Sequence, residues 1–245
     1  MDMYMSEESN QNQLSPQSVD YITATIKGIL GEVPFAGSLL VELAGTVFPN
    51  QRMDRIVKYA RVLEHKLSSL QQDFVRSQLT NENFTDLLEE GMRQAARSLS
   101  DERREYIANL IANSLSEQDV EYVEAKHLLR MLSEINDIEV IWLRYHLVPG
   151  IRVDKEFREK HVHIIEPIID RFTDPQIVHD RKALQDSYKG HLAQLGLLDT
   201  KYDYDKETGT PRYDSGTGAP KIRGYQLSPL GKLLLRYIGF SEPMK

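Results

Sequence analysis

The sequence predicts a mainly α-helical protein, in which an N-terminal helical bundle is followed by a winged-helix-like α+β region with one β-hairpin. Apolar residues recur every three or four positions through most of the first 150 residues. Short polar joints separate these stretches, as they do between the helices of a bundle. The last part of the chain changes character and alternates between helical and strand-like patterns.

The first 50 residues contain a polar tail and an apolar pair of helices. Residues 1–16 are rich in Ser, Asn, Gln and Glu, so we expect a disordered tail rather than a secretory signal. Helices are predicted over 17–30 and 36–47, with a Gly and Pro break between them. Two glutamates interrupt the apolar stretch 26–48, which leaves too few apolar residues for a membrane-spanning helix. A cytoplasmic location is therefore expected.

Successive amphipathic helices are predicted from there to residue 147. They cover about 50–70, 82–98, 101–115, 119–135 and 138–147. Each is preceded by a residue that can cap its first turn. The candidate caps are Asn50, Thr80 or Asn81, Ser100, Ser116 (with Asp119 in a capping box), and Asn136 or Asp137.

The remaining elements follow the order of a winged helix with a closing helix. A helix is predicted over 154–170, with Pro167 as a candidate kink or stop, and another over 176–196. Two strands, 200–205 and 222–227, flank a loop rich in Gly, Pro, Ser and Thr. The last helix begins at Ser228, which precedes a proline suited to the first helical position.

Charge is distributed unevenly along the chain, and it supports a division near residue 120. Residues 1–120 hold 11 Lys and Arg against 18 Asp and Glu, whereas the rest holds 19 of each. We therefore expect a helical region over 17–120 and a winged-helix-like domain over 121–245. The candidate nucleic-acid-binding residues lie in the second of these: Lys182, Lys189, His191, Lys201, Lys221 and Arg223. Acidic residues accompany them, and a helix that reads DNA normally brings several cations and few acids.

No pattern in the sequence indicates catalysis, a cofactor or a metal site. The chain has no cysteine, which excludes disulfides and thiolate ligands. Phosphate-binding loops, HExxH and Gly-x-Ser-x-Gly are absent. His161 and His163 are two apart, so on a helix they point to different faces and share no metal. Trp142, the single tryptophan, is expected to pack in the core. We expect no enzyme activity, no cofactor and no small-molecule substrate.

The apolar N-terminal hairpin is a candidate membrane-binding or partner-binding element that becomes exposed on triggering. The alternative is a tightly packed pair of core helices. The residues concerned are Phe35, Leu39, Leu40, Leu43, Val47 and Phe48. The Val-Pro-x-Ala-Gly turn over 33–37 resembles helical cell-death domains that disturb membranes.

Short motifs between about residues 80 and 240 are shared with a known bacterial family. The motif residues are Tyr106, Asn109, Leu110, Leu132, Ser133, Leu195, Gly196, Leu197, Leu227, Ser228 and Gly231. In this layout the chain resembles the Abi-alpha family of bacterial abortive-infection proteins. It departs from the family pattern at Asn136, where an acid is expected, and at Ser228, where Thr is usual. One extra residue also precedes Gly231. The resemblance implies a role in antiviral defence and brings no catalytic residues.

The sequence favours a non-enzymatic bacterial defence or regulatory component whose winged helix serves protein docking or oligomerisation. Its charge is too balanced for strong affinity for DNA. Two alternatives stay open: a DNA-binding transcriptional regulator, and a membrane-perturbing effector that acts through the N-terminal hairpin. The expected partner is a protein or a second copy of the chain, with nucleic acid or a membrane as the alternatives.

Overall fold

The protein is mainly helical and has a small two-stranded antiparallel sheet near its C-terminus, in agreement with the predicted class at this level. The computed structural model describes residues 52–116, 121–148, 154–216 and 218–241. The chain separates into two compact units, with the division between Arg104 and Glu105. Each unit is described by itself.

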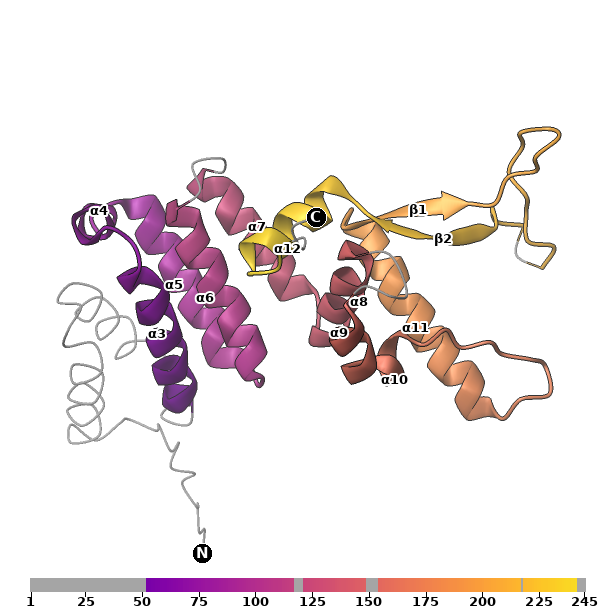
Figure 1. The fold of residues 1–245 in the computed structure, drawn as a ribbon, viewed down its shortest axis with the longest axis horizontal. Coiled ribbons are helices and arrows are strands. Elements are labelled where there is room, and N and C mark those ends of the chain that lie inside the picture. The colour runs from indigo at the N-terminus through magenta and orange to yellow at the C-terminus, as the bar shows by residue number, and fades with distance from the viewer. Residues whose placement is uncertain (1–51, 117–120, 149–153, 217, 242–245) are drawn as a thin grey trace, which may run out of the picture. The chain divides into compact units, whose positions relative to one another are not determined.

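The first unit contains α3 (Met53–Ser68), α4 (Gln72–Gln78) and α5 (Glu82–Arg97), and α3 packs along α5 (Figure 1). The predicted cap of α5 is confirmed, because the Asn81 side chain accepts hydrogen bonds from the backbone N–H groups of Asn83 and Phe84. Helix α4 was not predicted from the sequence. Apolar side chains of the three helices form the core: Ile56, Tyr59, Leu63, Leu67, Val75, Phe84, Leu87, Leu88 and Met92.

The second unit holds the remaining elements. Its helices are α6 (Asp101–Ser116) from Glu105 onward, α7 (Tyr122–Glu134), α8 (Asp137–Leu147), α9 (Lys155–Lys160), α10 (Val162–Ile165), α11 (Gln176–Gln194) and α12 (Pro229–Tyr237). Asn136 caps α8 as predicted, in a reciprocal capping box with Glu139. Ser228 caps α12, also as predicted.

Two predicted helix boundaries are wrong. The segment 154–170 is not one helix but α9 and α10, which meet at His161, followed by non-helical chain from Glu166. Pro167 explains the stop, because the residue before a proline avoids the helical region. Helix α7 is capped by Glu121 with Glu124 rather than by Ser116, whose hydroxyl donates to carbonyls of its own helix. Asp119 lies outside the described residues.

Strands β1 (Leu198–Tyr202) and β2 (Ile222–Leu227) form the hairpin that follows α11 (Figure 1). Strand β2 matches its predicted range, whereas β1 covers 198–202 instead of the predicted 200–205. Leu198 pairs with Leu227, and both are buried, so one face of the ribbon is anchored to the unit. The register shifts between Lys201 and Tyr202, and the isolated bridges Tyr204–Pro211 and Tyr213–Pro220 continue the ribbon beyond the strands.

The start of α12 is joined closely to the end of α11. The Ser228 hydroxyl donates to the Gly196 carbonyl at 2.6 Å and accepts from the Gly231 N–H at 2.9 Å. A Cβ at Gly231 would lie 2.2 Å from the Leu197 carbonyl oxygen, so only glycine permits this approach. Gly196 has a φ of +72°, which ends α11 in the left-handed conformation. These motif residues therefore have structural roles.

Helix α6 holds the other end of α12. The side-chain amide of Asn109 donates to the Ile238 carbonyl, and that of Asn113 donates to the Tyr237 carbonyl, both at 2.9 Å. These two asparagines are four residues apart and thus lie on one face of α6. They satisfy carbonyls that the last turn of a helix leaves without intrahelical partners.

Candidate functional site

Helix α11 packs against α8, and side chains near its C-terminal end contact that helix. Leu192 is fully buried. Nδ1 of His191 lies 2.6 Å from Oε1 of Glu139, whose side chain is 4% exposed. The Lys189 ammonium lies 5.1 Å from the centroid of the Trp142 ring. The contacts of Lys189 and His191 hold the C-terminal half of α11 against α8.

Gln185, in the middle of α11, holds the chain that follows α10. Its amide nitrogen donates to the carbonyls of Ile164 at 3.1 Å and Glu166 at 2.9 Å. Its amide oxygen lies 3.5 Å from the backbone nitrogen of Ile168, which donates to it. Gln185 is only 6% exposed, so these bonds compensate the burial of its amide. The non-helical segment is thereby positioned against α11.

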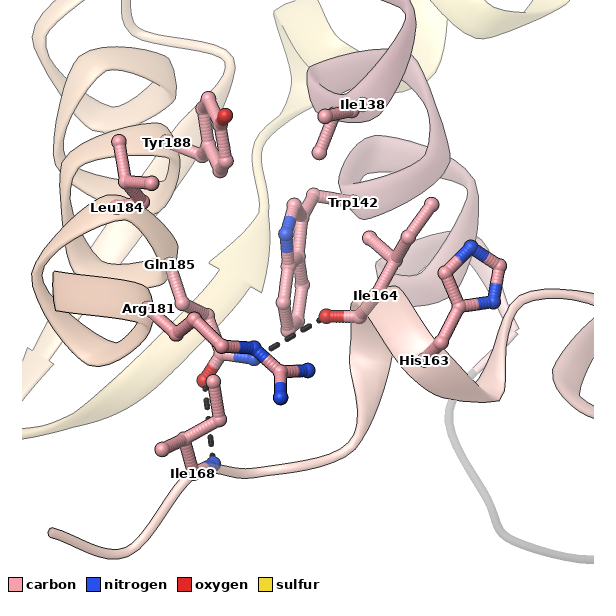
Figure 2. A pocket seen from close by; sticks show the side chains of 9 residues that line it. All are labelled: Ile138, Trp142, His163, Ile164, Ile168, Arg181, Leu184, Gln185 and Tyr188. Carbon is pink, nitrogen blue, oxygen red and sulfur yellow. Dashed lines mark hydrogen bonds between the residues drawn. The ribbon is translucent and has the colours of Figure 1, made fainter. Parts of the chain in front are cut away.

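A pocket of about 150 Å³ lies between α8, α10, this segment and α11 (Figure 2). Its walls are mostly apolar, and one lining residue, Arg181, is positively charged. The lining residues are Ile138, Trp142, His163, Ile164, Ile168, Arg181, Leu184, Gln185 and Tyr188. Trp142 is 4% exposed, as its predicted core role requires, and its Nε1 has no hydrogen-bond partner within the described ranges. Figure 2 shows that nitrogen on the ring edge facing α11.

The N-terminal half of α11 leaves apolar side chains exposed to solvent. Ile177 is 62% exposed and Leu184 is 55% exposed. Their spacing, with Arg181 between them, places all three on one helical face. The preceding segment adds Ile169 and Phe172, which are more exposed still. We call Ile177, Arg181 and Leu184 the outer face of α11.

The charges of α11 are mostly paired within the helix. Lys182 and Lys189 both form ion pairs with Asp186. The Arg181 guanidinium, in contrast, has no carboxylate partner in the parts of the chain that are described. The sequence suggested three α11 residues for nucleic-acid binding: Lys182, Lys189 and His191. All three interact with carboxylates of the same unit, the lysines with Asp186 and His191 with Glu139.

The hairpin carries the other predicted cations. Lys201, Lys221 and Arg223 are exposed, and their side chains form no ion pair with a described residue, as is also true of Lys206. Arg212 differs, because Asp203 and Asp205 lie within 4 Å of its guanidinium. Residues 201–223 contain five cations and four carboxylates, so the hairpin is close to neutral overall.

A second cluster lies on the opposite side of α8. The Arg144 guanidinium pairs with Asp154 and stacks near the rings of Phe157 and Phe240. His146 lies instead on the Trp142 side of α8, where burial, with the positive charges of Lys189 and Arg158, lowers its pKa to about 4. The imidazole is therefore neutral at physiological pH. The contacts of Arg144 join α8 to α9 and to Phe240 after α12, and so they stabilise the unit.

Within the described ranges, no group of three or more His, Asp or Glu side chains is placed to hold a metal ion. None of the described helices combines the length and hydropathy that crossing a bilayer requires. The candidate membrane or partner residues Phe35, Leu39, Leu40, Leu43, Val47 and Phe48 lie outside the described residues.

The pocket was not predicted from the sequence, although the spacing of apolar residues along α11 indicates an apolar surface there. Ile177, Leu184, Tyr188 and Leu192 recur at helical spacing on one face of α11, yet of these only Leu192 is buried, so the N-terminal part of this apolar stripe is left uncovered. A pocket between two apolar sides can bind an apolar group, and Arg181 can pair with an anion beside it. Comparison of the chain with protein-family models, curated proteins and solved structures found no match.

Proposed function

We propose that this chain is a non-enzymatic bacterial defence or regulatory component, and that its second unit is a winged-helix-like module that docks a protein. The order α8, α11, β1, β2 and α12 supports the winged-helix comparison. In that comparison α11 is the helix that would enter a DNA groove. The defence role rests on the resemblance to the Abi-alpha family alone.

The outer face of α11 is the observation that carries the docking proposal. Its exposed side chains at 177 and 184 are apolar, and the lysines beside them are paired with Asp186. Protein interfaces have apolar centres depleted of charge, whereas a groove-reading helix offers cations to phosphates and bases. The composition of this face supports a protein partner, including a second copy of the chain.

Site-specific photo-crosslinking tests the proposal. A benzoylphenylalanine at position 177 of the full chain, in the cells that produce it, is expected to crosslink a protein. Leu184→Asp, which replaces an apolar side chain of the face by a charged one, should abolish that product. Position 123 is the matched control, because Val123 on α7 is 70% exposed and remote from α11 in sequence. Equal crosslinking from both positions, or none from 177, would contradict the proposal.

A second candidate function is DNA binding through the hairpin. It is favoured by four exposed cations that form no ion pair with a described residue: Lys201, Lys206, Lys221 and Arg223. Such cations bind phosphates with an affinity that falls steeply as salt rises. The test is fluorescence anisotropy with duplex DNA over a salt titration, using the full chain and its K221E/R223E variant. Salt-dependent binding that the variant loses supports this function, and absent or salt-independent binding removes it.

A further inference from the structure

We infer that the pocket beside α11 receives one apolar side chain of a partner protein, from a segment that places a carboxylate next to that side chain. This inference rests on the proposed docking function and names the chemistry of the partner. It follows from the volume of the pocket, its lining and the charge of Arg181.

The volume of the pocket limits what it can hold. Pockets for drug-sized ligands and cofactors measure roughly 300–1,000 Å³, whereas a cavity of about 150 Å³ accommodates a single benzene ring. The present pocket, at about 150 Å³, matches one aliphatic or aromatic side chain.

The surroundings of the pocket indicate a protein segment rather than a free small molecule. Leu184 both lines the pocket and belongs to the exposed outer face of α11, so the pocket opens onto an apolar surface. Interface anchors are typically apolar or aromatic side chains that fill a pocket within such a surface. A segment anchored here would cover the outer face in the same step.

Arg181 sets the charge of the partner. It lines the pocket, is exposed, and lacks a carboxylate partner among the described residues, unlike the neighbouring Lys182. A carboxylate beside the anchor would complete a charge-assisted hydrogen bond with the guanidinium. His163, which also lines the pocket, carries no negative charge that would repel the partner's carboxylate. The complementary segment is therefore acidic as well as apolar.

The fluorescence of Trp142 reports on binding in the pocket, because it is the only tryptophan in the chain and its indole forms one wall. We would titrate the full chain with three short capped peptides, Asp-Leu-Asp, Lys-Leu-Lys and Asp-Ala-Asp, and follow indole fluorescence. Asp-Leu-Asp should give a saturable change, with an affinity on the order of millimolar for so few contacts. The basic peptide and the peptide without an anchor should bind at least fivefold more weakly.

Two variants and one control test the assignment to this pocket. Arg181→Gln should weaken binding of the acidic peptide by roughly five- to tenfold, and Leu184→Asp should abolish it. Arg130→Gln is the matched control, since it removes the same charge from an arginine on α7 that is 78% exposed, and should leave binding unchanged. Both variants alter exposed side chains, so the emission spectrum of the free protein should confirm that each is folded.

Several outcomes would overturn the inference: no fluorescence change, equal changes with all three peptides, or a stronger change with duplex DNA. Crosslinking from position 177 separates this failure from a failure of the docking function. If the crosslink to a protein persists while the peptides do not bind, only the pocket assignment falls. If both are absent, the docking function falls as well.

Discussion

Helix α5 of the first unit and helix α11 of the second use their apolar residues in opposite ways. Helix α5 buries a full stripe of apolar side chains and glycine, from Phe84 to Ala96. Helix α11 is longer, yet among its described residues it buries only Gln185 and Leu192, and it leaves Ile177 and Leu184 exposed. The fold thus accounts for the apolar pattern of α5 but for only part of that of α11.

This difference separates residues kept for stability from residues available for binding. An apolar side chain that the fold buries contributes to the free energy of unfolding, whereas one that stays exposed contributes little. Exposed apolar residues that gather on one helix face, next to a pocket, are typical of interaction surfaces. The two helices should therefore respond differently to substitution.

The largest expected effect comes from Phe84→Ala in α5. Phe84 is fully buried, so its loss should lower the free energy of unfolding by about 3–5 kcal/mol, through lost burial and the cavity left behind. The measurement is urea denaturation followed by circular dichroism. Phe74→Ala in α4 is the matched control, because Phe74 is 40% exposed and should cost about 1 kcal/mol or less. Equal losses for the two variants would contradict the assignment of the core.

Glycine-to-alanine substitutions make the same comparison in the second unit. Gly231→Ala forces a methyl group against the Leu197 carbonyl and should cost about 2–3 kcal/mol, as overpacking does. Gly190→Ala on α11 meets no atom within 4 Å, and helix propensity should make it stabilising by about 0.5–1 kcal/mol. Thermal unfolding of the two variants measures both effects, and shifts of the same sign would count against this account.

The elements that the sequence predicts well are those whose signals are local. Asn81 and Asn136 cap their helices, Ser228 caps α12, and β2 matches its range, because each depends on residues within one turn or strand. The pocket depends instead on Gln185, which binds a segment 17 to 21 residues away along the chain. No local pattern distinguishes that glutamine from an exposed one. For the same reason, only the fold shows that Lys182 is paired and that Arg181 has no carboxylate partner among the described residues.

The buried side of α8 provides a pH-dependent test. Because the folded state holds the pKa of His146 at about 4, while the unfolded chain protonates histidine near 6.5, unfolding takes up a proton below pH 6.5. Stability should therefore fall by about 2 kcal/mol between about pH 6.5 and pH 4, after allowance for partial contact with solvent. His146→Phe should remove this component, measured as the difference in urea midpoint between the two pH values. An unchanged pH dependence would show that His146 is not the group responsible.

The smallest expected effect, and the one that makes the comparison sharpest, is Ile177→Ser on the outer face of α11. Ile177 is 62% exposed, so the substitution should change the free energy of unfolding by no more than about 0.5 kcal/mol. If the outer face is a docking surface, the same variant should still reduce crosslinking from position 184 severalfold, because exposed apolar residues at an interface become buried only in the complex. A large loss of stability would mean that Ile177 belongs to the core, and α11 would then resemble α5 after all.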